Sequence, residues 1–209
     1  MESLGGREVF KDNRLKRTRT NVTLAAGATH VLLAPEGKHN FAQPWTYSNE
    51  RDTFGTLRAE HDFGEGLTAW AAAGYRSGDE ANSLANLTVT NAATGAGTVY
   101  RFDNAREDRI GTGELGLRGK LRTGGIGHEW VASASAYSGG VMSDPRLTGR
   151  VRLASIAVGD ILSLLDERLR ITLGLRHQKL HMQDFAYTTA RLTNDYKHSR
   201  TSPVLGALM

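Results

Sequence analysis

The stretch Leu169-Arg-Ile-Thr-Leu-Gly-Leu-Arg176 alternates apolar and polar residues along its whole length. Leucine or isoleucine fills each odd position, and arginine, threonine or glycine fills each even one. Successive side chains of a β-strand point to opposite faces, so this period of two predicts a strand with one apolar and one polar face. A helical face would also need apolar pairs three residues apart, but here that spacing joins apolar residues to polar ones.

The same alternation recurs at residues 20–28, 53–63 and 112–121. Tight turns are predicted at residues 63–67, 123–127 and 165–168, and long polar loops at residues 34–51, 78–107, 139–149 and 184–200. Because short and long connections take turns along the chain, the sequence predicts an all-β, antiparallel up-and-down meander of about eight strands. The expected strands are residues 17–33, 52–63, 67–77, 107–122, 128–138, 149–164, 169–182 and 200–209.

Composition excludes several classes of protein before any motif is considered. The 209 residues include no cysteine, which removes disulfide frameworks, thiolate metal sites and cysteine nucleophiles. The net charge of +4 is spread along the chain without a basic block, so nucleic-acid binding is not expected. No run approaches the ~18 apolar residues of a membrane-spanning helix, and the first residues contain no apolar signal segment.

Two kinds of β-protein, soluble and membrane-embedded, differ in what surrounds the apolar faces of their strands. In a soluble sandwich or lipocalin-like barrel the apolar residues fill a core, whereas in an outer-membrane barrel they face lipid and the polar set lines the interior. Strands of ten or more residues, and the small residues alternating at 69–73 and 132–136, favour the membrane barrel.

Several stretches carry a more specific signal than alternation. They are Ala42-Gln-Pro-Trp-Thr-Tyr-Ser48, Arg51-Asp-Thr-Phe-Gly-Thr-Leu-Arg-Ala-Glu60, Thr98-Val-Tyr-Arg-Phe-Asp-Asn-Ala105, Thr112-Gly-Glu-Leu-Gly-Leu-Arg-Gly-Lys-Leu-Arg-Thr-Gly124, Gly127-His-Glu129, Asp166-Glu-Arg-Leu-Arg-Ile-Thr-Leu-Gly-Leu-Arg-His-Gln178 and Ser202-Pro-Val-Leu-Gly206. Together they resemble the barrel domain of TonB-dependent siderophore receptors, the ferrichrome-type outer-membrane iron transporters. The resemblance runs from Arg17 to Met209.

The resemblance implies a fold, a location and partners. Such receptors have a signal peptide, a plug domain and about twenty-two strands, so the chain is expected to be a fragment of a large transmembrane β-barrel that does not transport alone. Residues 17–209 would be a partial barrel domain, and residues 1–16 an N-terminal segment without clear assignment. The implied location is the bacterial outer membrane. The implied partners are outer-membrane lipid, a ferric siderophore as transported ligand and the energy-coupling TonB complex acting through the plug.

Two sets of residues are candidates for function. The first consists of charges on the polar strand faces, which the resemblance places in the barrel lumen: Arg58, Glu60, Glu114, Arg118, Lys120, Arg170 and Arg176. The second consists of aromatic residues near the long loops, as an interfacial girdle or as contacts to the siderophore: Trp45, Tyr47, Tyr100, Phe102 and Tyr187.

No motif predicts catalysis, a cofactor or a metal. Gly111-Thr-Gly-Glu-Leu-Gly116 matches a dinucleotide fingerprint, but it lies inside a predicted strand instead of at the start of a helix. His177 and His181 would be about 13 Å apart on a strand, too far to share a metal. Two other functions stay open: a small self-contained outer-membrane β-barrel with a structural or adhesive role, and a soluble β-barrel binding module.

Overall fold

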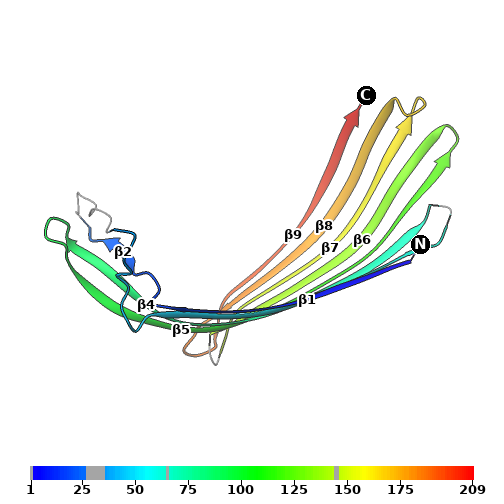
Figure 1. The fold of residues 1–209 in the computed structure, drawn as a ribbon. Coiled ribbons are helices and arrows are strands. Elements are labelled where there is room, and N and C mark those ends of the chain that lie inside the picture. Colours follow the sequence, from blue (N-terminus) through cyan, green and yellow to red (C-terminus); the bar gives the residue numbers. More distant parts are fainter. Residues whose placement is uncertain (1, 27–35, 65, 144–145) are drawn as a thin grey trace. The chain divides into compact units, whose positions relative to one another are not determined.

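The computed structural model describes residues 2–26, 36–64, 66–143 and 146–209, and the strands in them confirm the all-β class (Figure 1). The strands are β1 Glu2–Lys16, β2 Asn21–Leu24, β3 Tyr47–Asp62, β4 Thr68–Asn91, β5 Ala96–Thr123, β6 Ile126–Ser143, β7 Arg146–Leu164, β8 Leu169–Phe185 and β9 Leu192–Leu208. Within these residues we find no helix that is long and apolar enough to span a membrane.

The long strands follow one another across a single sheet in the order β1-β3-β4-β5-β6-β7-β8-β9, which confirms the predicted meander. The described pairs β6–β7, β7–β8 and β8–β9 are all antiparallel. Strand β2 lies off this path and pairs parallel with β4, with Asn21 opposite Asn86. In the described order, β1 and β9 lie at the two edges of an open sheet.

The N-terminal part of the strand prediction was wrong. Residues 2–16, which the sequence left unassigned, form strand β1 next to β3. Of the strand predicted at residues 17–33, only Asn21–Leu24 is a strand, and residues 27–33 lie outside the described part. Strand β1 lacks a clean alternation because apolar and charged residues mix on both of its faces, yet backbone pairing with a neighbour needs no alternation.

Three of the four predicted long loops were also wrong. Residues 78–107 extend β4 and β5 into one long hairpin that turns at residues 92–95. Strands β6 and β7 reach Ser143 and Arg146, and the β8–β9 connection is confined to residues 186–191. At about 3.3 Å per residue, the 28 residues of β5 run far beyond the 9–11 that cross a bilayer. Polar composition in this chain therefore marks extended strand more often than loop.

The tight turns, by contrast, lie where they were predicted. Gly64, Gly66 and Gly124 adopt φ values of 80°, 78° and 62°, a left-handed conformation that glycine adopts without strain. The turn at residues 165–168 has no glycine, and its left-handed residues are Leu165, Asp166 and Glu167. Arg168 closes that turn by donating its N–H to the Leu165 carbonyl at 3.2 Å.

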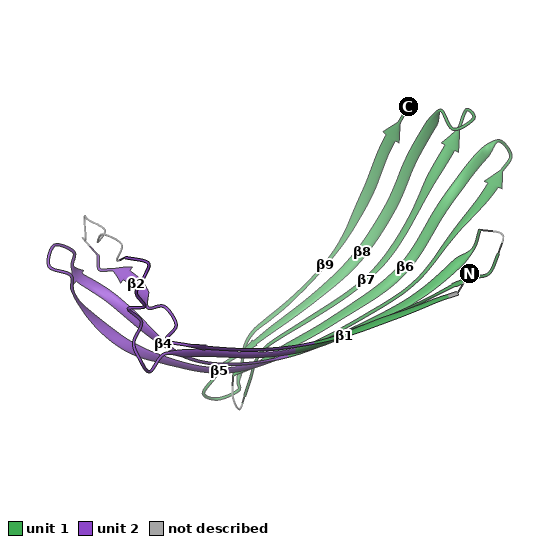
Figure 2. Cartoon of the chain, viewed as in Figure 1, with its two compact units in different colours: residues 1–9, 53–77, 108–209 green, residues 10–52, 78–107 purple. Residues whose placement is uncertain are grey.

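The chain divides into two compact units (Figure 2). The first unit comprises residues 1–9, 53–77 and 108–209, and the second comprises residues 10–52 and 78–107. The second unit has a small core, in which Val89, Ala85 and Ser83 are fully buried and Thr46 is nearly so. Arg17 holds residues 40–42 of this unit through hydrogen bonds to the carbonyls of Asn40 and Ala42, at 2.9 and 3.1 Å.

The first unit has two chemically different faces on strands β5–β9. Register places Val158 opposite Leu175, and Leu175 opposite Pro203, on what we call the apolar face. Register also places Ser155 opposite Gln178, and Gln178 opposite Arg200, on the other side, which we call the polar face. The parity of the side chains along each strand thus decides which face they join.

The apolar face carries large hydrophobic side chains that nothing in the described residues covers. Leu115, Ile156 and Leu205 are 65%, 61% and 79% exposed. All buried hydrophobic residues of the described chain, Ala42, Ala85 and Val89, belong to the second unit. An exposed apolar surface of this kind marks a site of contact with protein or membrane. A soluble binding module would have to bury the same residues in an interior.

Candidate functional site

A first cluster of predicted charges lies on β3 and β5 in the first unit. Glu60 accepts a hydrogen bond from Arg58 at 3.0 Å and also pairs with Arg118. Arg58 and Glu60 are two residues apart on β3, so their side chains share a face, and the Arg118 contact shows that β5 presents its even-numbered residues to the same face. The structure therefore brings together three of the seven predicted charges.

A second cluster is centred on Glu129 of β6, a residue that the sequence analysis did not select. Lys120 and Arg170 approach its Oε1 at 3.3 and 3.5 Å. One carboxylate thus lies between cations from β5 and β8 on the polar face. We call these two clusters together the charge lattice, defined by Arg58, Glu60, Arg118, Lys120, Glu129 and Arg170.

The remaining two predicted charges have partners of other kinds. Glu114 accepts a hydrogen bond from the Trp70 indole at 2.5 Å, and Arg58 lies 5.8 Å from the centre of that ring. Arg176 donates to the Ser155 hydroxyl at 3.2 Å. All seven predicted charges are thus on the polar face, and Trp70 joins them there.

Trp70 also explains a glycine in the rejected dinucleotide motif. A Cβ built on Gly116 would lie 2.0 Å from the Trp70 ring, so this position admits no side chain. Gly116 lets the indole lie flat against β5, where it can reach Glu114. Gly111 and Gly113 have open space around them instead, so the three glycines of the motif do not share one task.

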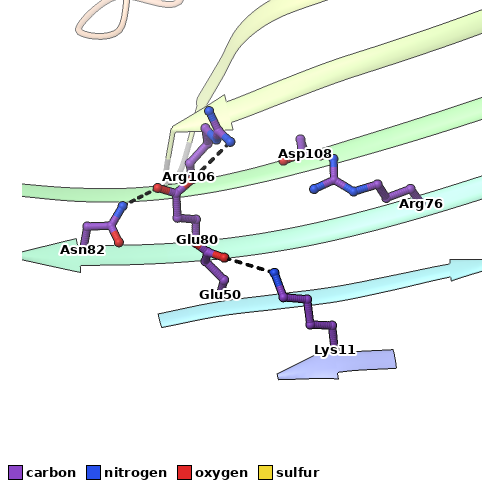
Figure 3. A network of polar contacts seen from close by, with 7 residues as sticks. All are labelled: Lys11, Glu50, Arg76, Glu80, Asn82, Arg106 and Asp108. Atoms are coloured by element: carbon purple, nitrogen blue, oxygen red, sulfur yellow. Dashed lines mark hydrogen bonds and ion pairs between the residues drawn. The ribbon is translucent and has the colours of Figure 1, made fainter. Parts of the chain in front are cut away.

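Further ion pairs extend along β4 and β5 (Figure 3). In the first unit Arg76 binds Asp108 at 2.5 Å. In the second unit Glu80 accepts from Arg106 at 3.0 Å, and Asn82 also contacts it. Glu80, Asn82 and Arg106 belong to the stretch 78–107 that was predicted as loop, and the structure places them on regular strands, where they contact one another.

The five predicted aromatic residues do not form one cluster. Trp45 precedes β3, Tyr47 begins it, and Tyr187 lies in the β8–β9 connection. Tyr100 and Phe102 lie within β5, not in a loop, and they are exposed. Trp45 and Tyr47, which are half-buried, belong to the second unit with Tyr100 and Phe102, whereas Tyr187 belongs to the first.

Trp45 has a cation–π partner on β5. The Arg101 guanidinium lies 5.5 Å from the centre of its ring, and Arg101 also donates to Asp103 at 2.9 Å. Gln43, Trp45, Val99 and Arg101 line a hollow of about 480 Å³ in the second unit. Sequence reasoning missed Arg101, although alternation along β5 places it on the face opposite to Tyr100 and Phe102.

A few polar residues lie on the apolar face. Near the tight-turn end, His128 Nδ1 and Asp160 Oδ2 are 2.7 Å apart. Near the other end, His177 contacts the Thr201 hydroxyl at 2.9 Å, and His181 contacts Asp195 at 2.5 Å. The two histidines of the rejected metal motif thus have separate partners on β9.

The Asp195 carboxyl lies near the start of β9, where Lys197 and His181 contact it. Lys197 donates to it at 3.0 Å, and these hydrogen bonds from Lys197 and then His181 hold the pKa of Asp195 below its ordinary value. Within the described ranges no group of three or more histidine, aspartate or glutamate side chains is arranged to hold a metal ion.

Comparisons of sequence and of structure find that this chain is similar to siderophore receptors. Ferrichrome receptor FcuA of Yersinia enterocolitica is 25% identical over 230 residues, which cover 96% of this chain and 30% of that protein. BauA, the ferric preacinetobactin receptor of Acinetobacter baumannii, is 20% identical with a TM-score of 0.77, covering 98% of this chain and 34% of its own. The open form of Fiu, the ferric-catecholate import receptor of E. coli K12, is 12% identical with a TM-score of 0.56, covering 82% and 35%.

These comparisons show the fold of this chain and how much of each relative it covers. The two solved structures share the fold of this chain, and the chain spans 30–35% of the length of these three relatives. The family model named TonB dependent receptor-like, beta-barrel matches residues 5–208, nearly the whole chain. This chain therefore belongs to the TonB-dependent receptor-like β-barrel family.

Proposed function

We propose that this chain forms part of the wall of a β-barrel receptor that takes up ferric siderophores across the bacterial outer membrane. The observation that carries the proposal is the family match together with the division of β5–β9 into a lipid-type face and a charged face. Within the barrel the charge lattice would face the lumen, where a plug domain coupled to TonB would contact it. No catalytic step is needed, because binding on one side and release on the other accomplish uptake.

The relatives support a ferric siderophore as the ligand. FcuA is a ferrichrome receptor, BauA a ferric preacinetobactin receptor and Fiu a ferric-catecholate import receptor. Such ligands are bulky and expose polar and aromatic surface, which the Trp45–Arg101 hollow can meet with a ring face and a guanidinium. Among the five predicted aromatic residues, Trp45 is therefore our first choice for ligand contact.

A genetic experiment tests the proposed function. Disrupting the reading frame that encodes this chain should abolish uptake of radiolabelled iron from one class of ferric siderophore and spare the other classes. Ferrichrome, preacinetobactin and a catecholate are the classes to compare first. Unchanged uptake of every siderophore would overturn the proposal and favour a structural or adhesive barrel.

A point variant tests the site itself. Trp45→Ala should raise the KM for uptake by about tenfold, since stacking on a desolvated ring contributes on the order of 1–2 kcal/mol. Phe41→Ala is the matched control, because Phe41 is an exposed aromatic residue of the same segment. An equal effect of both variants, with equal amounts of protein in the membrane, would contradict a role for Trp45 in binding.

A further inference from the structure

A hollow of about 530 Å³ lies on the polar face of the first unit. Small residues leave this space open, among them Ala72 and Gly74 of β4 and Ser135 of β6. A Cβ built on Gly74 would come within 2.6 Å of the Thr112 hydroxyl, so this position has no room for a side chain. The volume is typical of sites that bind small molecules. The hollow beside Trp45 is a different one, because it belongs to the second unit.

The hollow is lined by a guanidinium group that has no carboxylate partner. Arg176 of β8 donates to the Ser155 hydroxyl at 3.2 Å, and that hydroxyl lies 2.9 Å from the hydroxyl of Ser135. Register places Arg200 of β9 opposite Gln178, in the row next to Arg176. Among the described residues neither arginine forms an ion pair with a carboxylate. Like charges in neighbouring rows repel each other, so an anion bound beside them would stabilise this part of the sheet.

Apolar side chains also line this hollow and continue beyond it on the same face. Leu153 of β7 lies opposite Tyr137 of β6 and Leu180 of β8, and Val151 lies opposite Met182 in the next row. We call these five residues the inner band, and all of them are half-buried. The interior of a membrane barrel is ordinarily polar, so a group of apolar side chains on this face indicates contact with a further molecule.

The charged groups that line the hollow have a net positive balance. They are Arg58, Glu114 and Arg176, and the Glu114 carboxylate already accepts a hydrogen bond from the Trp70 indole at 2.5 Å. Arg176 and the neighbouring hydroxyls can therefore bind anionic oxygen atoms, while the inner band offers an apolar contact. These groups surround a hollow instead of forming a flat surface, which favours a compact small molecule over an extended protein segment.

We propose that this hollow and the inner band select a ferric complex that has a net negative charge and an aryl or alkyl part. The inference rests on the proposed function and names the class of ferric siderophore. Arg176 contacts the anionic oxygen atoms that surround the iron, and Tyr137 and Leu153 contact the aryl or alkyl part. A ferric complex of catecholates carries a net negative charge, whereas a ferric complex of hydroxamates such as ferrichrome is neutral. The hollow therefore favours the catecholate class.

Uptake kinetics with two ligands test the inference in cells that produce this protein and lack other siderophore receptors. Uptake of radiolabelled iron is measured over a range of concentrations of ferrichrome and of a ferric catecholate. We expect the lower KM for the catecholate. Arg176→Gln should raise that KM about tenfold and leave the KM for ferrichrome nearly unchanged, because a hydrogen bond to a charged group is lost with the anionic ligand alone.

Three further variants separate the site from general effects of charge and folding. Arg168→Gln removes the same formal charge at a tight turn outside the hollow and should leave both KM values unchanged. Arg176→Lys keeps the charge and should retain most of the preference, which also shows that β8 still folds after substitution. Leu153→Asn should raise the KM for the catecholate about fivefold, because part of the energy of burying a leucine against the aryl group is lost.

The other outcomes are also decisive. Equal losses in Arg176→Gln and Arg168→Gln would overturn the inference, because general charge attraction explains them. If Arg176→Gln lowers the maximal rate equally for both ligands, Arg176 holds a protein segment such as a plug domain, and the ligand assignment fails. Uptake of ferrichrome without a preference for the anionic complex would overturn the inference and leave the proposed function standing. If the parent protein takes up no ferric siderophore, the proposed function itself fails.

Discussion

The charge lattice and the cations of the apolar face differ in how their charges are paired. On the polar face, Glu60 and Glu129 each pair with two cations, so every member of the charge lattice has a partner of opposite charge. On the apolar face, Arg152 and Lys179 have no carboxylate partner among the described residues. The charge lattice thus pairs its charges across neighbouring strands, whereas these two cations of the apolar face have no such partner. The comparison teaches that the register of the strands, more than the number of charges, decides which charges are paired.

Placing a cation in the centre of the apolar face should have the largest effect. Leu175 lies opposite Val158 and Pro203, midway along β8 between the turn at residues 165–168 and His181. Leu175→Arg would place a charge near the middle of the hydrocarbon layer and should lower the free energy of unfolding by about 2–4 kcal/mol. Urea unfolding of the chain in phosphatidylcholine vesicles measures this difference.

The control for this variant is a matched substitution on the polar face. Thr172 lies on the same strand and faces Ile161 and Gly206 on the other side of the sheet. Thr172→Arg should cost much less, because its side chain would lie on the polar face, within reach of the Glu129 carboxylate. Equal costs for the two variants would contradict the distinction between an apolar and a polar face.

The packing of Trp70 on the polar face should give the next largest effect. Gly116→Ala places a methyl group into the space of the indole, which must move away from Glu114, and should cost about 1–3 kcal/mol. Gly113→Ala is the matched control, since nothing lies within 4 Å of the added Cβ, and it should be neutral or slightly stabilising. Urea unfolding in the same vesicles compares them, and a cost shared by both glycines would point to backbone effects alone.

Sequence reasoning located the tight turns correctly. The tight turns near Gly64, Gly124 and Leu165 were predictable because glycine or charged residues interrupt clear alternation there. Toward the strand ends that lie away from the tight turns, the alternation fails because both faces of the strands carry polar residues there. Backbone pairing continues all the same, so residues 78–107 form strand although their composition suggested loop.

The candidate site was also predictable only in part: the strand face of each residue could be predicted, but its partner on the next strand could not. Parity along one strand was enough to place Arg58 with Glu60 on one face, and Lys179 with Leu175 on the other. The partners on neighbouring strands were not predictable, because they depend on register. Glu129 as the shared partner of Lys120 and Arg170 emerges only when three strands are aligned. The row formed by Arg152, His181 and Lys197 has the same origin.

Neutralising one charge on each face sharpens the comparison directly. Glu60→Gln leaves Arg58 and Arg118 without their shared carboxylate and should destabilise the chain by about 0.2–1 kcal/mol, because the pairs are partly exposed to solvent. Arg152→Gln should be neutral or stabilising in phosphatidylcholine vesicles, since Arg152 lies in one row with Lys197 and the two positive charges repel each other. Raising the salt concentration should shrink both effects. Opposite signs support the contrast in charge pairing, and a loss of stability in both variants contradicts it.

The smallest expected effect concerns Asp195, a carboxylate on the apolar face of β9 that contacts Lys197 and His181. Its pKa is lowered in the folded chain by hydrogen bonds from Lys197 and His181, so the folded state favours the ionised form. The resulting stabilisation is present above the ordinary aspartate pKa of about 3.9 and is lost as the pH falls through the lower folded value. In vesicle unfolding curves, Asp195→Asn should therefore be less stable than the parent at neutral pH and should approach it below about pH 4. A difference that stays constant with pH would show that the Asp195 side chain acts through its shape and not through its charge.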